Sequence, residues 1–124
     1  MSDRDTGMKT RREVLGDEHV DRAGAAATSF DAPFQDLITR YAWGAVWSRP
    51  QLDRRTRSAI TLSALVTLRA ENELELHVRA ALRNGLSAQE IGEILLHTAV
   101  YAGVPAANGA FSLTREVLRE EGAI

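Results

Sequence analysis

The chain of 124 residues contains no cysteine. This absence excludes a disulfide framework, a thiol nucleophile, a CxxC redox pair and every thiolate-ligated metal or iron–sulfur site. Histidine is also scarce, with three residues, and none of them follows an HExxH or HxH spacing. We therefore expect no metal site.

The sequence also lacks an excess of positive charge, because 15 basic and 17 acidic side chains give a formal net charge of -2. Such a chain has no broad electrostatic attraction for nucleic acid or for an anionic membrane. No apolar run is long enough to cross a bilayer, and the charged N-terminus has no apolar signal segment. We expect a cytoplasmic protein with neither nucleic acid nor membrane as a partner.

Strand signals are nearly missing, since no Asn-Gly or Asp-Gly turn joins two segments of alternating polarity. Helix-forming Ala, Leu, Arg and Glu fill the periodic stretches instead. The spacing predicts an all-α fold, a single domain over residues 1–124 with six to seven short helices. The expected helices cover about 5–15, 17–27, 31–47, 53–68, 72–84, 87–102 and 105–119.

Several of these expected helices carry Ala-rich faces, whose small side chains fill little of a hydrophobic core within one chain. Helical spacing places Ile60, Ala64 and Leu68 on one apolar ridge, with further apolar residues beside it. A second stripe begins at Phe34 and continues through Leu37 and its helical neighbours Ile38, Tyr41 and Ala45. The Ala-rich faces favour self-association as a homo-oligomer, and the wide apolarity around the Ile60 ridge indicates a helix buried on several sides.

Glu73 and His77 form an i, i+4 pair near the start of an expected helix. The helix dipole favours the neutral imidazole there, whereas the carboxylate favours the protonated one. The balance makes the histidine a candidate general acid or base. The alternative is that Glu73 is an ordinary first-turn acid and His77 a partly buried structural histidine.

Glu93, His97 and Tyr101 repeat the four-residue spacing one helix later. A carboxylate, an imidazole and a phenol on one face are able to relay protons. They lie off the apolar stripe of their helix, so a solvated edge is the favoured interpretation. Tyr101, next to the break at Gly103, is the member expected near a cavity.

Two tryptophans, Trp43 and Trp47, precede a short basic segment that includes Arg49 and Arg57. Aromatic walls with guanidinium groups at the rim suit a small molecule that carries a carboxylate. The alternative is that the tryptophans anchor helix contacts and the arginines are interface or solvated residues.

Three segments together resemble the carboxymuconolactone decarboxylase family over most of the chain: TRREVLGDEHV, WGAVWSRPQLDRRTRSAITL and ENELELHVRAALRNGLSAQEIGEILLHTAVYAGVPAANGAF. The wider superfamily includes alkylhydroperoxidase-D-like reductases with a CxxCxxxH motif. Here Ala70 and Glu73 occupy the cysteine positions before His77, and Ser58 lies near a position that is often glutamate. The peroxidase chemistry is therefore not expected, and the ELxxH pattern of the decarboxylases remains.

The resemblance implies an alkylhydroperoxidase-D-like helical bundle that assembles as a trimer or hexamer. It implies a cofactor-independent decarboxylase that converts 4-carboxymuconolactone, a lactone dicarboxylate, to 3-oxoadipate enol-lactone and CO2 in the protocatechuate branch of the β-ketoadipate pathway. His77 would then donate a proton and Glu73 would orient it. Arg49 or Arg57 would anchor carboxylates, Tyr101 and Asn108 would be further donors, and Trp43 and Trp47 would be walls. The alternatives are action on a related lactone or β-keto acid, and a non-enzymatic helical assembly module.

Overall fold

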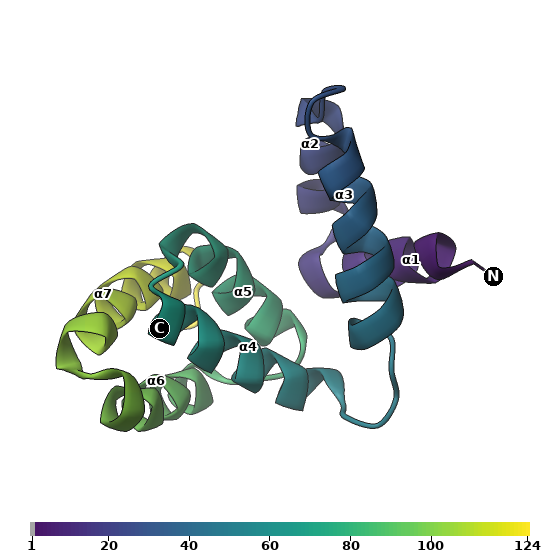
Figure 1. Cartoon of the computed structure of the whole chain (residues 1–124). Helices are drawn as coiled ribbons and strands as arrows, with labels where there is room; N and C mark the ends of the chain where they lie inside the picture. Colours follow the sequence, from purple (N-terminus) through teal and green to yellow (C-terminus); the bar gives the residue numbers. More distant parts are fainter. Residues whose placement is uncertain (1) are drawn as a thin grey trace. The chain divides into compact units, whose positions relative to one another are not determined.

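The computed structural model describes residues 2–124, and the all-α prediction is confirmed because these residues form helices and no strand (Figure 1). The chain divides into two compact units, an N-terminal unit of residues 1–54 and a C-terminal unit of residues 55–124. The expectation of one domain for the whole chain stays a prediction. The elements in order are α1 (Asp3–Leu15), α2 (Asp17–Ala26), α3 (Ala32–Ile38), η1 (Thr39–Trp47), α4 (Arg54–Leu68), α5 (Glu71–Arg83), α6 (Ala88–Ala102) and α7 (Val104–Glu120).

Most helix ends lie where the local sequence predicts them. Ser87 and Glu90 form a capping box at the start of α6, with the Glu90 backbone N–H donating to Ser87 Oγ at 3.1 Å and the Ser87 backbone N–H donating to Glu90 Oε1 at 3.0 Å. Gly103 ends the same helix with a φ of 96°, a backbone conformation that residues with a side chain disfavour. The predicted start of α5 at Asn72 is wrong, because the helix begins at Glu71 without a side-chain cap.

The N-terminal unit is organised by the close approach of α1 and η1. A Cβ added to Gly7 would overlap the carbonyl oxygen of Thr39, and one added to Gly44 would overlap that of Asp3. The backbones of α1 and η1 are therefore in contact at one glycine from each helix, Gly7 and Gly44. Ser48 Oγ strengthens this contact, since it lies 2.7 Å from Thr10 Oγ1 on α1 and donates to the Trp43 carbonyl at 2.6 Å.

The second half of the expected helix over residues 31–47 is a π-helix, η1, which is rare at nine residues. A π-helix has a wider turn than an α-helix. The α-helical spacing that groups Phe34 with Tyr41 and Ala45 therefore does not apply through η1. Phe34, Leu37 and Tyr41 are exposed, whereas η1 buries Thr39 and Trp43. The apolar stripe of this segment is thus a surface of the N-terminal unit.

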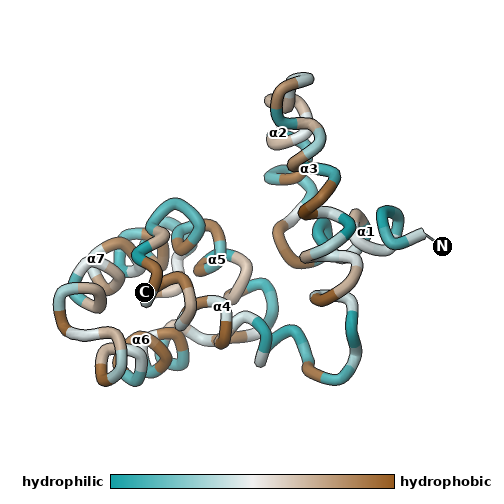
Figure 2. Tube along the Cα trace, viewed as in Figure 1, coloured by the Kyte–Doolittle hydropathy of each residue, from teal (hydrophilic) through white to brown (hydrophobic). Residues whose placement is uncertain are grey.

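The C-terminal unit has a hydrophobic core to which all four of its helices contribute. Its buried members are Leu62, Val66, Leu74, Val78, Ala81, Leu86, Ile91, Leu95, Ala110, Val117 and Leu118. On α4 the ridge of Ile60 and Leu68 is exposed, whereas Leu62 and Val66 are buried in the core, so the expected burial of this helix on several sides is not seen within the unit. Figure 2 shows apolar and polar stretches alternating along the helices of this unit. No helix within residues 2–124 is both long and apolar enough to span a bilayer.

Candidate functional site

The eight predicted site residues are divided between the two units. The C-terminal unit carries Glu73 and His77 on α5, Arg57 on α4, Tyr101 on α6 and Asn108 on α7, and the N-terminal unit carries Trp43, Trp47 and Arg49.

Helix α5 places Glu73 and His77 one turn apart on the same face. Glu73 is exposed, whereas His77 is half-buried and its Nδ1 atom is shielded from solvent. The helix begins two residues before Glu73, so its partial positive end lies beside the pair. An imidazole in this setting has one shielded nitrogen and a solvent-exposed carboxylate one turn away.

A partly buried hydrogen bond links the residue that follows α5 to α4. The Nδ2 atom of Asn84 donates at 2.8 Å to Oγ of Ser58, which is buried. This bond ties the C-terminal end of α5 to α4. Arg57, next to Ser58, is half-buried with a shielded Nε atom.

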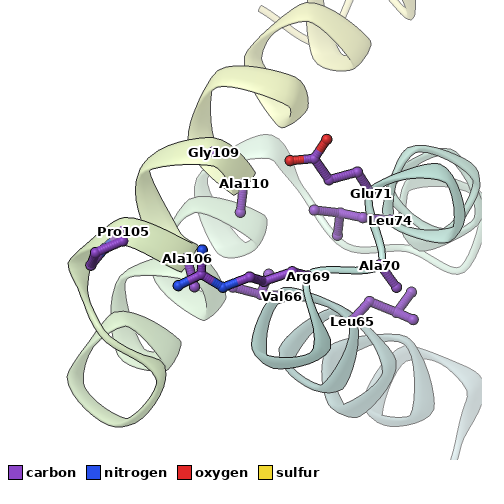
Figure 3. Close-up of a pocket in the computed structure, with 10 residues that line it drawn as sticks. All are labelled: Leu65, Val66, Arg69, Ala70, Glu71, Leu74, Pro105, Ala106, Gly109 and Ala110. Atoms are coloured by element: carbon purple, nitrogen blue, oxygen red, sulfur yellow. The ribbon is translucent and has the colours of Figure 1, made fainter.

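A pocket of about 50 Å³ lies at the N-terminal turn of α5, between the end of α4 and the start of α7 (Figure 3). Its apolar surface comes mainly from small and aliphatic residues, namely Leu65, Val66, Ala70, Leu74, Pro105, Ala106 and Ala110. Arg69 and Glu71 supply the two charged side chains that line it, and Gly109 completes the wall. Among residues 2–124, none of the eight predicted site residues lines this pocket.

Arg69 holds a left-handed backbone conformation, with a φ of 57°, at the end of α4. The Ala70 backbone N–H donates to the Leu65 carbonyl at 3.0 Å, which closes the helix in the manner that usually uses glycine. An arginine here is strained by the standards of ordinary residues. The sequence analysis missed Arg69, because only the φ angle and the pocket distinguish it from other exposed arginines.

The tryptophans lie together in η1, with ring centroids 5.1 Å apart and planes inclined by 32°. Trp43 is buried and Trp47 is half-buried. The two rings pack on each other within the N-terminal unit, and Trp47 keeps part of its surface accessible.

Tyr101 packs on His97 with ring centroids 5.4 Å apart, so the predicted four-residue spacing does bring these rings together. Tyr101 is 79% exposed, and Glu93 and His97 are exposed as well. Asn108 is exposed on α7. These side chains form a solvated edge of the C-terminal unit.

No group of three or more His, Asp or Glu side chains within residues 2–124 is placed to hold a metal ion. The ionisable side chains of α5 are an imidazole, carboxylates and guanidinium groups. In the comparison with known proteins, the model of the carboxymuconolactone decarboxylase family matches residues 32–116. The chain belongs to the carboxymuconolactone decarboxylase family.

Relatives match beyond the family segment. A 4-carboxymuconolactone decarboxylase of Acinetobacter baylyi is 45% identical over 116 residues, which cover 94% of this chain and 87% of the relative. Nitrosuccinic acid decarboxylase npaB of Metarhizium robertsii is 46% identical over 116 residues, covering 94% and 81%. A 4-carboxymuconolactone decarboxylase of Pseudomonas putida is 52% identical over 40 residues, which cover 32% of this chain and 83% of that sequence.

Proposed function

We propose that the chain is a carboxy-lyase that converts 4-carboxymuconolactone to 3-oxoadipate enol-lactone and CO2 without a cofactor. The observation that carries this proposal is the 45% identity to the Acinetobacter enzyme over nearly the full length of both chains. The proposal places the reaction in the cytoplasm, in the protocatechuate branch of the β-ketoadipate pathway.

The substrate supplies its own electron sink. The ring carbon that is bonded to the lactone oxygen carries both the departing carboxylate and an acetate arm. When its bond to the carboxylate breaks, the electron pair moves through the ring double bond into the lactone carbonyl, and a ring carbon next to that carbonyl then takes a proton. The protein must hold the acetate arm, stabilise negative charge at the carbonyl oxygen and deliver the proton.

His77 is proposed as the proton donor, with Glu73 as its orienting partner one turn earlier. Its half-buried ring and shielded Nδ1 atom support this role, because partial burial fixes the position of the ring while part of it stays accessible. The Ser58–Asn84 bond ties the C-terminal end of α5 to α4. Tyr101 and Asn108 remain proposed as donors, and Trp43 and Trp47 as walls.

Arg69 joins Arg49 and Arg57 as a proposed carboxylate anchor. It lines an apolar pocket directly before α5, and its strained backbone supports a role beyond helix termination. We expect Arg69→Gly to raise KM more than about tenfold and to spare kcat, because a charge-assisted bond contributes about 1.5–3 kcal/mol and glycine accepts the positive φ. Arg83→Ala, an exposed arginine of α5, is the control. An unchanged KM in Arg69→Gly would make Arg69 purely structural.

Nitrosuccinate is a second candidate substrate, favoured by the 46% identity to the Metarhizium enzyme. It shares a recognisable unit with the lactone: one carbon carries the departing carboxylate, an acetate arm and an electron acceptor. In nitrosuccinate the nitro group accepts the electron pair. The same acid and anchors would serve both reactions, so the acceptor group decides between them.

Turnover by the purified chain tests the proposal. We expect loss of the ultraviolet band of 4-carboxymuconolactone with release of CO2, and a much lower kcat/KM for nitrosuccinate. We expect His77→Ala to retain its far-ultraviolet circular dichroism and to lose about 10²- to 10⁴-fold in kcat, the contribution typical of a general acid. Preferred turnover of nitrosuccinate would select the second candidate, and no turnover of either would favour the assembly module. A His77→Ala variant within a few-fold of wild type would end the assignment of His77.

We also propose that the chain forms a homo-oligomer, a trimer or a hexamer. The exposed apolar residues of the C-terminal unit support this, since Ile60 and Leu68 line a shallow groove on α4 and Leu96 and Val100 are exposed on α6. Sedimentation equilibrium tests the assembly. A single species at the chain mass of 13.6 kDa at all concentrations would contradict it.

A further inference from the structure

A pocket of about 220 Å³ lies within the N-terminal unit, among α1, α2, α3 and the start of η1. Apolar and small residues make up half of its lining, namely Met8, Val20, Gly24, Ala27 and Ala32. None of the residues assigned to the decarboxylation lines it. The pocket is large enough for a small organic molecule with an apolar body, because a single water needs only about 10–15 Å³.

One guanidinium group lies buried in the wall of this pocket. Arg11 on α1 is 6% exposed, and burial lowers the pKa of its side chain although arginine stays protonated. Its Nη1 atom donates to Thr39 Oγ1 at 3.3 Å, and its Nη2 atom donates to Gln35 Oε1 at 3.1 Å. Both acceptors are neutral, so neither balances the buried positive charge.

The Nε atom of Arg11 is shielded from solvent and has no acceptor within hydrogen-bond distance among residues 2–124. A guanidinium has five N–H donors, so the two bonds to Thr39 and Gln35 leave most of them for another partner. A buried polar atom without a partner is unusual, and a bound acceptor in the pocket would satisfy it.

The pocket also lacks a counter-charge for Arg11. Its one carboxylate, Asp36, already accepts from Arg4 at 3.1 Å and from Arg40 at 2.8 Å. No Asp or Glu within residues 2–124 forms an ion pair with Arg11. A buried charge is costly unless a partner of opposite sign meets it, and here that partner is missing from the protein.

We propose that this pocket binds a small carboxylate with a short apolar chain and that Arg11 anchors its carboxylate group. A carboxylate supplies the missing negative charge and two acceptor oxygens, which match adjacent N–H donors of a guanidinium. The apolar walls take the carbon chain out of water. Inorganic phosphate fits less well, because it gains nothing from those walls. The proposal does not depend on the function proposed above.

Titration of the full chain with sodium butanoate, followed by NMR, tests the site against sodium chloride at equal ionic strength. We expect a saturable shift of the Arg11 Nε–H resonance. Affinity should rise from acetate through propanoate to butanoate by roughly fourfold per methylene, the factor for a fully buried CH₂ group. Equal responses to butanoate and chloride would overturn the proposal, and phosphate binding as tight as butanoate would overturn the carboxylate assignment.

Two variants test the charge and the space of the site separately. Arg11→Met removes the charge and keeps the length of the side chain, and Gly24→Leu fills the pocket and leaves Arg11 in place. A Cβ on Gly24 meets no atom within 4 Å, so Gly24→Leu should fold even if Arg11→Met does not. Both should lose butanoate binding at least tenfold. Arg22→Met removes an exposed arginine of α2 outside the pocket and should bind as wild type. Wild-type binding by folded Gly24→Leu would overturn the proposal.

Discussion

Among residues 2–124, each unit buries three polar residues, but the C-terminal unit has Ser58, Thr98 and Thr114 beside a cluster of aliphatic side chains from four helices. The N-terminal unit buries Thr10, Arg11 and Thr39 beside four apolar residues, namely Val14, Leu15, Val20 and Trp43. Its helices α1 and η1 meet at glycine backbones and are also joined by side-chain hydrogen bonds such as that from Arg11 to Thr39. One unit therefore depends on hydrophobic area, and the other on close backbone fit and hydrogen bonds.

This difference assigns distinct tasks to the two units. A cluster of buried aliphatic residues gives α5 a rigid support, which suits helix-borne groups such as His77. In the N-terminal unit, a buried charge and an open pocket lower stability but provide a place for the carboxylate proposed above. The chain has both tryptophans in the N-terminal unit, so their fluorescence reports that unit separately from total helix content.

The largest effect on stability is expected in the C-terminal core. Leu95 is fully buried, so Leu95→Ala should cost about 2–5 kcal/mol through lost burial and the cavity that remains. Ile124, at the end of the same unit, is 62% exposed, and Ile124→Ala should cost less than about 1 kcal/mol. Urea unfolding followed by circular dichroism measures both. Equal losses in the two variants would show that this cluster is not the main source of stability.

A smaller loss is expected where α1 meets η1. Gly44→Ala places a methyl group against the Asp3 backbone, and over-packing of this kind costs about 1–3 kcal/mol. Tryptophan fluorescence should show the N-terminal unit unfolding at lower urea. Gly24→Ala is the control, because its Cβ meets open space and alanine favours the helix. If Gly44→Ala unfolds at the wild-type midpoint, the glycine contact does not hold this unit together.

The smallest effect concerns pH. Burial, together with the charges of Arg11 and Arg22, lowers the pKa of His19 below its ordinary value of 6.5. The unfolded chain then binds more protons than the folded one between the two pKa values, so stability should rise with pH through that interval and be complete above 6.5. The fluorescence midpoint measured from pH 5 to 7.5 should show this slope, and His19→Gln should reduce it. An identical slope in His19→Gln would assign the pH dependence to other groups.

Local signals predicted much of the fold. The Ser87–Glu90 pair and the glycines at 16 and 103 mark helix ends through bonds within a few residues, so the sequence shows them directly. The helical period also placed Glu73 with His77 and His97 with Tyr101. The outward ridge on α4 was not recognised, because periodicity groups apolar residues without saying which face meets the core.

The candidate site residues show the same difference between local sequence signals and tertiary contacts. His77 was predicted because a reactive residue type lies at helical spacing from a carboxylate, and its role stays a prediction. Arg69 and Arg11 were not predicted, because nothing in their neighbours separates them from the other arginines of an arginine-rich chain. Their distinction is a backbone angle in one case and burial without a counter-charge in the other.

The order of hydrophobic and polar residues by itself determined that this chain is helical, where most helices end and that thiol chemistry is excluded. Those properties depend on residue type and on contacts within one or two helical turns. The tertiary structure alone decided that α1 and η1 meet at Gly7 and Gly44, and that Arg11 is enclosed in a pocket. Such features arise when segments distant in sequence come together, so no local sequence pattern predicts them.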